Sequence, residues 1–175
     1  NAFSKYFGRG MASIVFQEIR EFRSLAYSSS GYYINRTHMD KRGYFQGYMG
    51  TQADKSIEAI STFLDLFKDM PKKENRIDGI RSGLVQSINS SKPGFRSRSQ
   101  AVSNWIKQGY SEDPNKLYYE KYKILTFDDI LSFYSSNIKK EPIVITIVTD
   151  KTKINIEKLA HFGKVINITK KDIFN

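Results

Sequence analysis

The chain has 175 residues, of which 39% are hydrophobic, 14% aromatic and 26% charged. This mixture is typical of a globular domain and excludes a disordered or fibrous chain. There is no cysteine, so disulfides and cysteine-based zinc sites are excluded. No apolar run approaches the roughly 18 residues of a membrane span, and we expect none.

The first residues are predicted to form the end of a helix. Residues 1–7 have a helical pattern, Gly8 and Gly10 interrupt it, and residues 11–22 resume the three-to-four spacing of apolar side chains. The chain starts with Asn1 instead of methionine and is already helical there. We therefore expect a single, truncated domain over residues 1–175, cut from a longer product.

Two strands are predicted next, followed by a series of helices. Tyrosines and serines over residues 25–35 and the alternation over residues 43–50 are typical of an antiparallel hairpin. Two capping boxes are expected, at residues 51–54 and at residues 126–129. The predicted helices run from the first box to before Pro71, then over 73–90, 95–110 and 118–122, and from the second box through Tyr134. A turn is expected at residues 113–115.

The C-terminal part is predicted to contain two more strands. Residues 143–148 are β-branched and follow a break at Pro142, residues 154–162 are helical in pattern, and residues 165–168 form a short apolar run. Strands and helices are segregated along the chain, so the fold class is α+β, with helices packed on one face of a mainly antiparallel sheet. Four strands are few for so many helices, and missing N-terminal strands would explain this.

The two histidines do not predict a metal site. His38 and His161 are far apart and have no second histidine or glutamate at ligand spacing, so we interpret both as surface residues. The net charge of +10 is spread in isolated pairs, and Arg96 and Arg98 form the densest arginine spot. This spread favours a solvated surface over a nucleic-acid footprint, and nucleic-acid binding stays only as a third hypothesis.

The most informative motif lies in the first 30 residues or so. Residues 6–13 form a glycine-containing turn, residues 16–21 read Phe-Gln-Glu-Ile-Arg-Glu, and residues 25–28 read Leu-Ala-Tyr-Ser. This pattern, continued by residues 48–51 and the long helices, resembles the insulinase-like (pitrilysin) zinc metallopeptidases, which include the mitochondrial processing peptidases. One departure is Ser24, where that family usually has glycine.

The resemblance implies a half-domain of a larger enzyme. Active members have two homologous halves, and the zinc-binding half carries an inverted histidine-x-x-glutamate-histidine motif, which is absent from this sequence. The chain is therefore expected to be the later portion of a domain of the non-metal C-terminal half. It would bind no metal and would not be catalytic alone, with zinc bound by the other half or by a partner subunit.

In the non-metal half of that family, an arginine and a tyrosine seven positions later reach the peptide substrate, and Arg20 and Tyr27 stand in this relation here. A guanidinium can grip a peptide carbonyl or carboxylate, and a phenol can donate to an oxyanion. The alternatives are an ion pair of Arg20 with Glu21 or with a neighbouring chain, and a core or sheet-face role for Tyr27.

Two functions thus follow from the resemblance. One is the substrate-binding portion of a zinc-dependent metalloendopeptidase; the other is a non-catalytic family member that acts as a partner or scaffold subunit. The sequence leaves the localisation open, and the resemblance implies a periplasmic or secreted protein if the source is bacterial.

Overall fold

A computed structural model describes residues 1–174. The N-terminal part consists of α1 (Ala2–Phe7), the π-helix η1 (Phe16–Glu21) and the hairpin of β1 (Ala26–Ile34) and β2 (Tyr44–Thr51). The remaining elements follow in chain order: η2 (Ala53–Lys55), α2 (Ser56–Lys68), η3 (Glu74–Arg76), α3 (Ile77–Ser90), η4 (Phe95–Ser97), α4 (Arg98–Lys107), α5 (Pro114–Lys123), α6 (Phe127–Asn137), α7 (Ile156–Leu159), η5 (Ala160–Phe162) and α8 (Lys170–Ile173).

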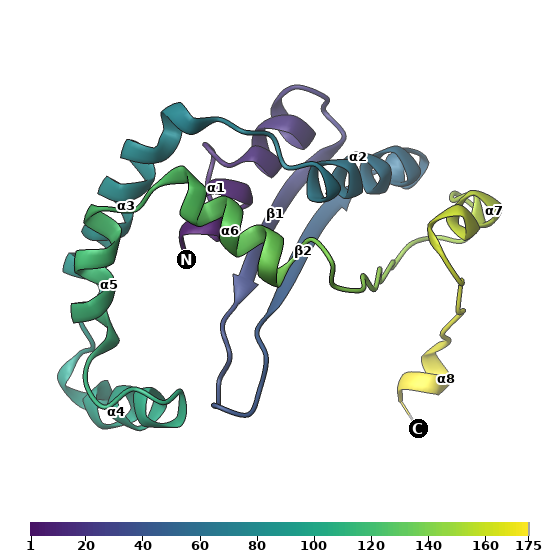
Figure 1. Ribbon diagram of the computed structural model, residues 1–175. Helices are drawn as coiled ribbons and strands as arrows, with labels where there is room; N and C mark the ends of the chain where they lie inside the picture. The colour runs from purple at the N-terminus through teal and green to yellow at the C-terminus, as the bar shows by residue number, and fades with distance from the viewer. Residues whose placement is uncertain (175) are drawn as a thin grey trace.

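The hairpin has one covered face and one open face. Its strands are antiparallel, with Ser29 opposite Met49 and Tyr33 opposite Phe45 on the side of the helices. Helices α1, α2 and α6 lie across that side of the sheet (Figure 1). The predicted hairpin is confirmed, and the α+β class with helices on one face of an antiparallel sheet is confirmed with it.

The core between the hairpin and these helices is rich in phenylalanine. The ring of Phe7, which is fully buried, lies 5.6 Å from that of Phe45, 6.2 Å from that of Phe63 and 6.1 Å from that of Phe67. Edge-to-face pairs of this kind stabilise a core beyond the burial of their area. Gly47 is needed in this packing, because a Cβ there would lie 2.6 Å from the Phe63 ring.

One predicted capping box is confirmed and the other is wrong. The backbone N–H of Asp129 donates to the Thr126 hydroxyl (3.2 Å), and the Thr126 N–H donates to the Asp129 carboxylate (2.8 Å), at the start of α6. The hydroxyl of Thr51, by contrast, donates to the carbonyl oxygen of Leu25 at 2.5 Å. Thr51 is the last residue of β2, and Gln52 stands at the N-cap of η2. The Thr51 hydroxyl therefore bonds to the neighbouring segment at Leu25 and does not cap a helix.

The four-strand prediction is wrong within residues 1–174, where the sheet has two strands. Residues 143–148 form no strand, with Val144 and Val148 almost fully exposed, and residues 165–168 are likewise irregular. β-Branched residues favour strands because they pack on neighbouring strands, and neither segment has such a neighbour here. The expected turn at residues 113–115 is instead the start of α5, which Asp113 caps.

Candidate functional site

The helix that carries Arg20 is wound as a π-helix. The N–H of Phe22 donates to the carbonyl of Gln17, five residues earlier, at 2.9 Å. Ile19 is completely buried, whereas the neighbouring Arg20 is exposed. One side of this short helix therefore anchors in the core while the other side presents a guanidinium. π-Turns of this kind occur mostly as single turns and frequently at functional sites.

A tight reversal connects this helix to β1. The N–H of Ser24 donates to the carbonyl of Arg20 (3.1 Å), and the N–H of Leu25 donates to that of Ile19 (2.9 Å). Ser24 has a φ of +50°, a left-handed conformation that favours glycine. Ser24 stands where the family that the sequence resembles usually has glycine. The turn from η1 to β1 forms with serine in this left-handed conformation.

Tyr27 is the extra residue of a β-bulge. Ala26 pairs with Thr51 and Ser28 pairs with Gly50, so no residue of β2 stands opposite Tyr27. Tyr27 and Ser28 are both exposed, which breaks the alternation of the strand, and Tyr27 is 85% exposed. Bulges re-aim side chains and are common beside active sites. Here the bulge places the phenol in solvent.

The two predicted site residues lie next to one another. The guanidinium carbon (Cζ) of Arg20 is 5.5 Å from the centre of the Tyr27 ring and 4.8 Å from the centre of the Phe16 ring. These distances are those of cation–π contacts. The Nε of Arg20 also lies 3.6 Å from a carboxylate oxygen of Glu21, so the ion pair weighed as an alternative is present as well.

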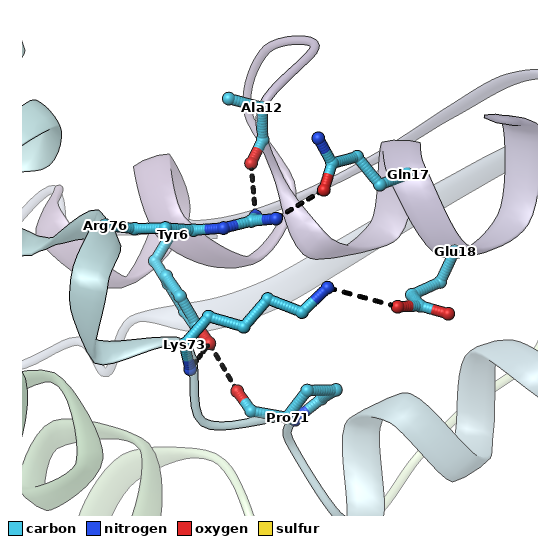
Figure 2. Close-up of polar contacts among 7 residues, drawn as sticks. All are labelled: Tyr6, Ala12, Gln17, Glu18, Pro71, Lys73 and Arg76. Carbon is cyan, nitrogen blue, oxygen red and sulfur yellow. Dashed lines mark hydrogen bonds and ion pairs between the residues drawn. The ribbon is translucent and has the colours of Figure 1, made fainter. Parts of the chain in front are cut away.

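The opposite side of the π-helix is tied to the segment before α3, as Figure 2 shows. The ammonium of Lys73 lies 3.3 Å from a carboxylate oxygen of Glu18. The guanidinium of Arg76 donates to the carbonyl of Ala12 at 2.5 Å and to the side-chain oxygen of Gln17. These bonds span about 55 to 64 positions of sequence and hold the helix that presents Arg20.

Tyr6 also binds the segment of residues 71–73 that precedes α3. Its hydroxyl donates to the carbonyl of Pro71 and accepts the N–H of Lys73 at 3.0 Å (Figure 2). Burial raises the pKa of the Tyr6 phenol, while the Lys73 N–H and the charge of Arg76 act in the opposite direction. The phenol therefore stays protonated and serves as a structural link, since only its neutral form can donate to Pro71.

The donors of the site are available to a ligand. Within residues 1–174, the one ion pair of Arg20 involves its Nε and Glu21, which leaves the terminal guanidinium nitrogens out of that contact. A guanidinium fork and a phenol side by side can together hold a carbonyl or carboxylate oxygen. The arrangement can bind and polarise a peptide.

No metal centre accompanies these donors. Among residues 1–174, no three His, Cys, Asp or Glu side chains gather in a way that could hold an ion. His38 and His161 are both exposed, as expected for surface residues. Over residues 1–174, no helix is long and apolar enough to cross a membrane.

A large hollow lies elsewhere, along β2. It has a volume of about 1350 Å³ and lies between β2, helix α2 and residues 143–149. Arg20 and Tyr27 do not line it. We place the candidate site at Arg20 and Tyr27 rather than in this hollow. The α2 side of the hollow is apolar, with Ile60, Phe63 and Leu64. Within residues 1–174, the hollow also lies beside the edge of β2 that pairs with no further strand.

Sequence reasoning named Arg20 and Tyr27 but missed the residues that support them. The contact of Phe16 with Arg20 could have been found from their spacing of four on a helix. Lys73 and Arg76 left no such signal, because their partners are distant in sequence.

Comparison with protein families gives one match. Residues 1–84 match the family described as "Peptidase M16 inactive domain". This range contains α1, η1, the hairpin, α2 and the segment with Lys73 and Arg76. A comparison with curated proteins finds no match.

Proposed function

We propose that this chain positions peptide substrates for a zinc-dependent, insulinase-like metallopeptidase, and the match of residues 1–84 to the peptidase M16 inactive-domain family supports the proposal. Another half, or a partner subunit, would hold the zinc. The chain would be non-catalytic by itself.

The observation that carries the proposal is the contact of Arg20 with Tyr27 on an exposed corner of the fold. Arg20 would grip a carbonyl or carboxylate of an extended peptide through its terminal N–H groups. Tyr27 would donate its hydroxyl to the carbonyl oxygen of the bond to be cleaved. That donation strengthens as negative charge develops on the oxygen, so it lowers the barrier as well as binding the substrate.

Zinc in the other half would activate the attacking water, and every role given to this chain is one of binding and orientation. The π-helix and the bulge support this division of labour. They set Arg20 and Tyr27 beside one another on anchored backbone, and a positioning site needs its donors held in place before the substrate arrives.

The test uses the parent enzyme, or the complex of this chain with its zinc-bearing partner, and follows hydrolysis of β-casein. Tyr27→Phe is expected to lower kcat by about tenfold to a thousandfold, on the scale of a lost oxyanion donor, without changing the unfolding midpoint. Tyr48→Phe is a matched control, since it removes an exposed phenol from β2. Equal kcat for Tyr27→Phe and the wild type would contradict the proposal.

The alternative role, a non-catalytic partner or scaffold, makes a different prediction. The family description as an inactive domain favours it as the second candidate. In that case, both Tyr27→Phe and Arg20→Ala leave hydrolysis unchanged, while loss of the whole chain dissociates the assembly. Size-exclusion chromatography with and without the chain, run beside the hydrolysis assay, separates the two roles.

A further inference from the structure

Phe16 has a side chain whose role the proposed function does not explain. Phe16 is the first residue of η1, and Arg20 follows four positions later, one residue before the helix ends. The Phe16 ring is half-buried, and the guanidinium of Arg20 lies over it at 4.8 Å, closer than it lies to the Tyr27 ring. The ring is thus the nearest aromatic support of the functional arginine.

The backbone holds Phe16 in this place. Its N–H donates to the hydroxyl of Ser13 at 3.4 Å, and Val15, immediately before it, is completely buried. The side chain of Arg20, by contrast, is 42% exposed, and its one ion pair, with Glu21, has a separation of 3.6 Å. An exposed ion pair of that length fixes an arginine weakly. The face of the Phe16 ring adds a second restraint of comparable size on the guanidinium.

From this geometry we infer that Phe16 is a positioning residue for Arg20. Its ring holds the guanidinium beside the ring of Tyr27. The inference rests on the proposed function, because it assigns Phe16 a role in peptide binding through Arg20. Phe16 itself touches no substrate.

The first test reads the position of Arg20 without any ligand. In NMR spectra of the 175-residue chain, aromatic rings shift the Nε–H signal of a guanidinium stacked on them. Phe16→Leu keeps apolar bulk but removes the ring, and is expected to move the Arg20 signal toward that of a solvated arginine. Phe16→Tyr keeps a ring and is expected to retain the signal. An Arg20 signal that is the same in Phe16→Leu and the wild type would overturn the positioning role.

The second test reads binding, with fluorescently labelled β-casein as the unfolded polypeptide. Phe16→Leu is expected to weaken binding by about threefold, the scale of one exposed cation–π contact, and Phe16→Tyr to restore it. Phe22→Ala is the matched control, since this exposed ring contacts Lys73 (5.9 Å) and makes no such contact with Arg20. A loss in Phe22→Ala as large as in Phe16→Leu would contradict the inference.

The two readouts also separate the two proposals. A shifted Arg20 signal together with no β-casein binding by the wild type would overturn the proposed function while showing that Phe16 does orient Arg20. Binding by the wild type together with equal affinity of Phe16→Leu would overturn the role of Phe16 and leave the proposed function standing.

Discussion

The guanidinium carbon of Arg20 lies 5.5 Å from the centre of the Tyr27 ring, although the two residues belong to different elements. Arg20 lies near the end of the π-helix η1, and Tyr27 lies in the β-bulge of β1. The contact between them therefore depends on both the π-helix and the bulge. Residues in contact couple energetically, and their substitutions are not additive.

Coupling between Arg20 and Tyr27 is the first prediction. In the parent enzyme, Arg20→Ala is expected to raise KM for β-casein because it removes the grip on the peptide, and to lower kcat as well because Tyr27 loses its neighbour. The double variant Arg20→Ala, Tyr27→Phe should be less impaired than the product of the two single effects. A double-mutant cycle on kcat/KM checks this, and strictly multiplicative effects would argue against a shared role.

Replacing Ser24 with glycine should stabilise the chain. The left-handed φ of +50° costs a residue with a Cβ roughly 1–2 kcal/mol, and glycine adopts it freely. The larger entropy of glycine in the unfolded chain offsets part of this gain. The expected net effect is a rise of up to about 1 kcal/mol in the free energy of unfolding, measured by urea denaturation. Ser24→Ala, which keeps the Cβ, should give no such rise.

Removing the hydroxyl of Tyr6 should destabilise the fold. Tyr6→Phe leaves the carbonyl of Pro71 and the N–H of Lys73 without their partner (Figure 2). An unsatisfied group in a partly buried place costs about 1–3 kcal/mol. Urea denaturation measures the loss, and Tyr44→Phe, in which an exposed phenol is changed, is the control. Equal stabilities of the two variants would show that the bridge contributes nothing.

Stability should fall in alkaline solution. Burial raises the pKa of Tyr6 and Tyr134 above the ordinary value of 10.0. Above about pH 10 the unfolded chain loses these phenol protons while the folded chain keeps them, so the folded state binds more protons and stability falls as pH rises toward the folded pKa. Below that range the contribution is fully present.

The measurement is the free energy of unfolding at about pH 9 and about pH 11. Tyr6→Phe removes one of the shifted phenols, so its stability should fall less steeply over this interval than that of the wild type. A wild-type chain whose stability is the same at both values would contradict the prediction.

The two capping boxes near the C-terminus offer a matched pair. Thr126→Ala should lower stability by about 1 kcal/mol, because it removes the cap of α6, which packs in the core through Ile130 and Tyr134. At the start of the short, exposed α8, the N–H and the hydroxyl of Thr169 donate to the Asp172 carboxylate, and Thr169→Ala should leave global unfolding unchanged. Thermal unfolding of both variants compares them directly, and equal losses would mean that local capping, rather than the core contact, decides the effect.

Much of the fold could be predicted because its signals are local. The alternation over residues 43–50 lies within one strand, and the box at Thr126 lies within four consecutive residues. Such patterns depend on spacing along the chain, which the sequence contains in full. Residues 143–148 show the limit of this reasoning, since a β-branched run indicates a strand only where a second strand lies alongside.

Thr51 illustrates the same limit at a single side chain. Its place three residues before Asp54 suits a capping box, yet its hydroxyl donates across the hairpin to Leu25. The acceptor of the Thr51 hydroxyl is set by the folded structure, because Leu25 is 26 positions away in the sequence.

The candidate site divides in the same way. The order of residues determined by itself that an arginine on a helix precedes a tyrosine at the start of a strand, and the resemblance to a peptidase family follows from that order. Only the tertiary structure decided that the helix winds as a π-turn, that Tyr27 is bulged, and that Lys73 and Arg76 brace the helix from another segment. The physical reason is that spacing along a chain specifies local geometry, whereas contacts between distant segments exist only once the core has brought them together.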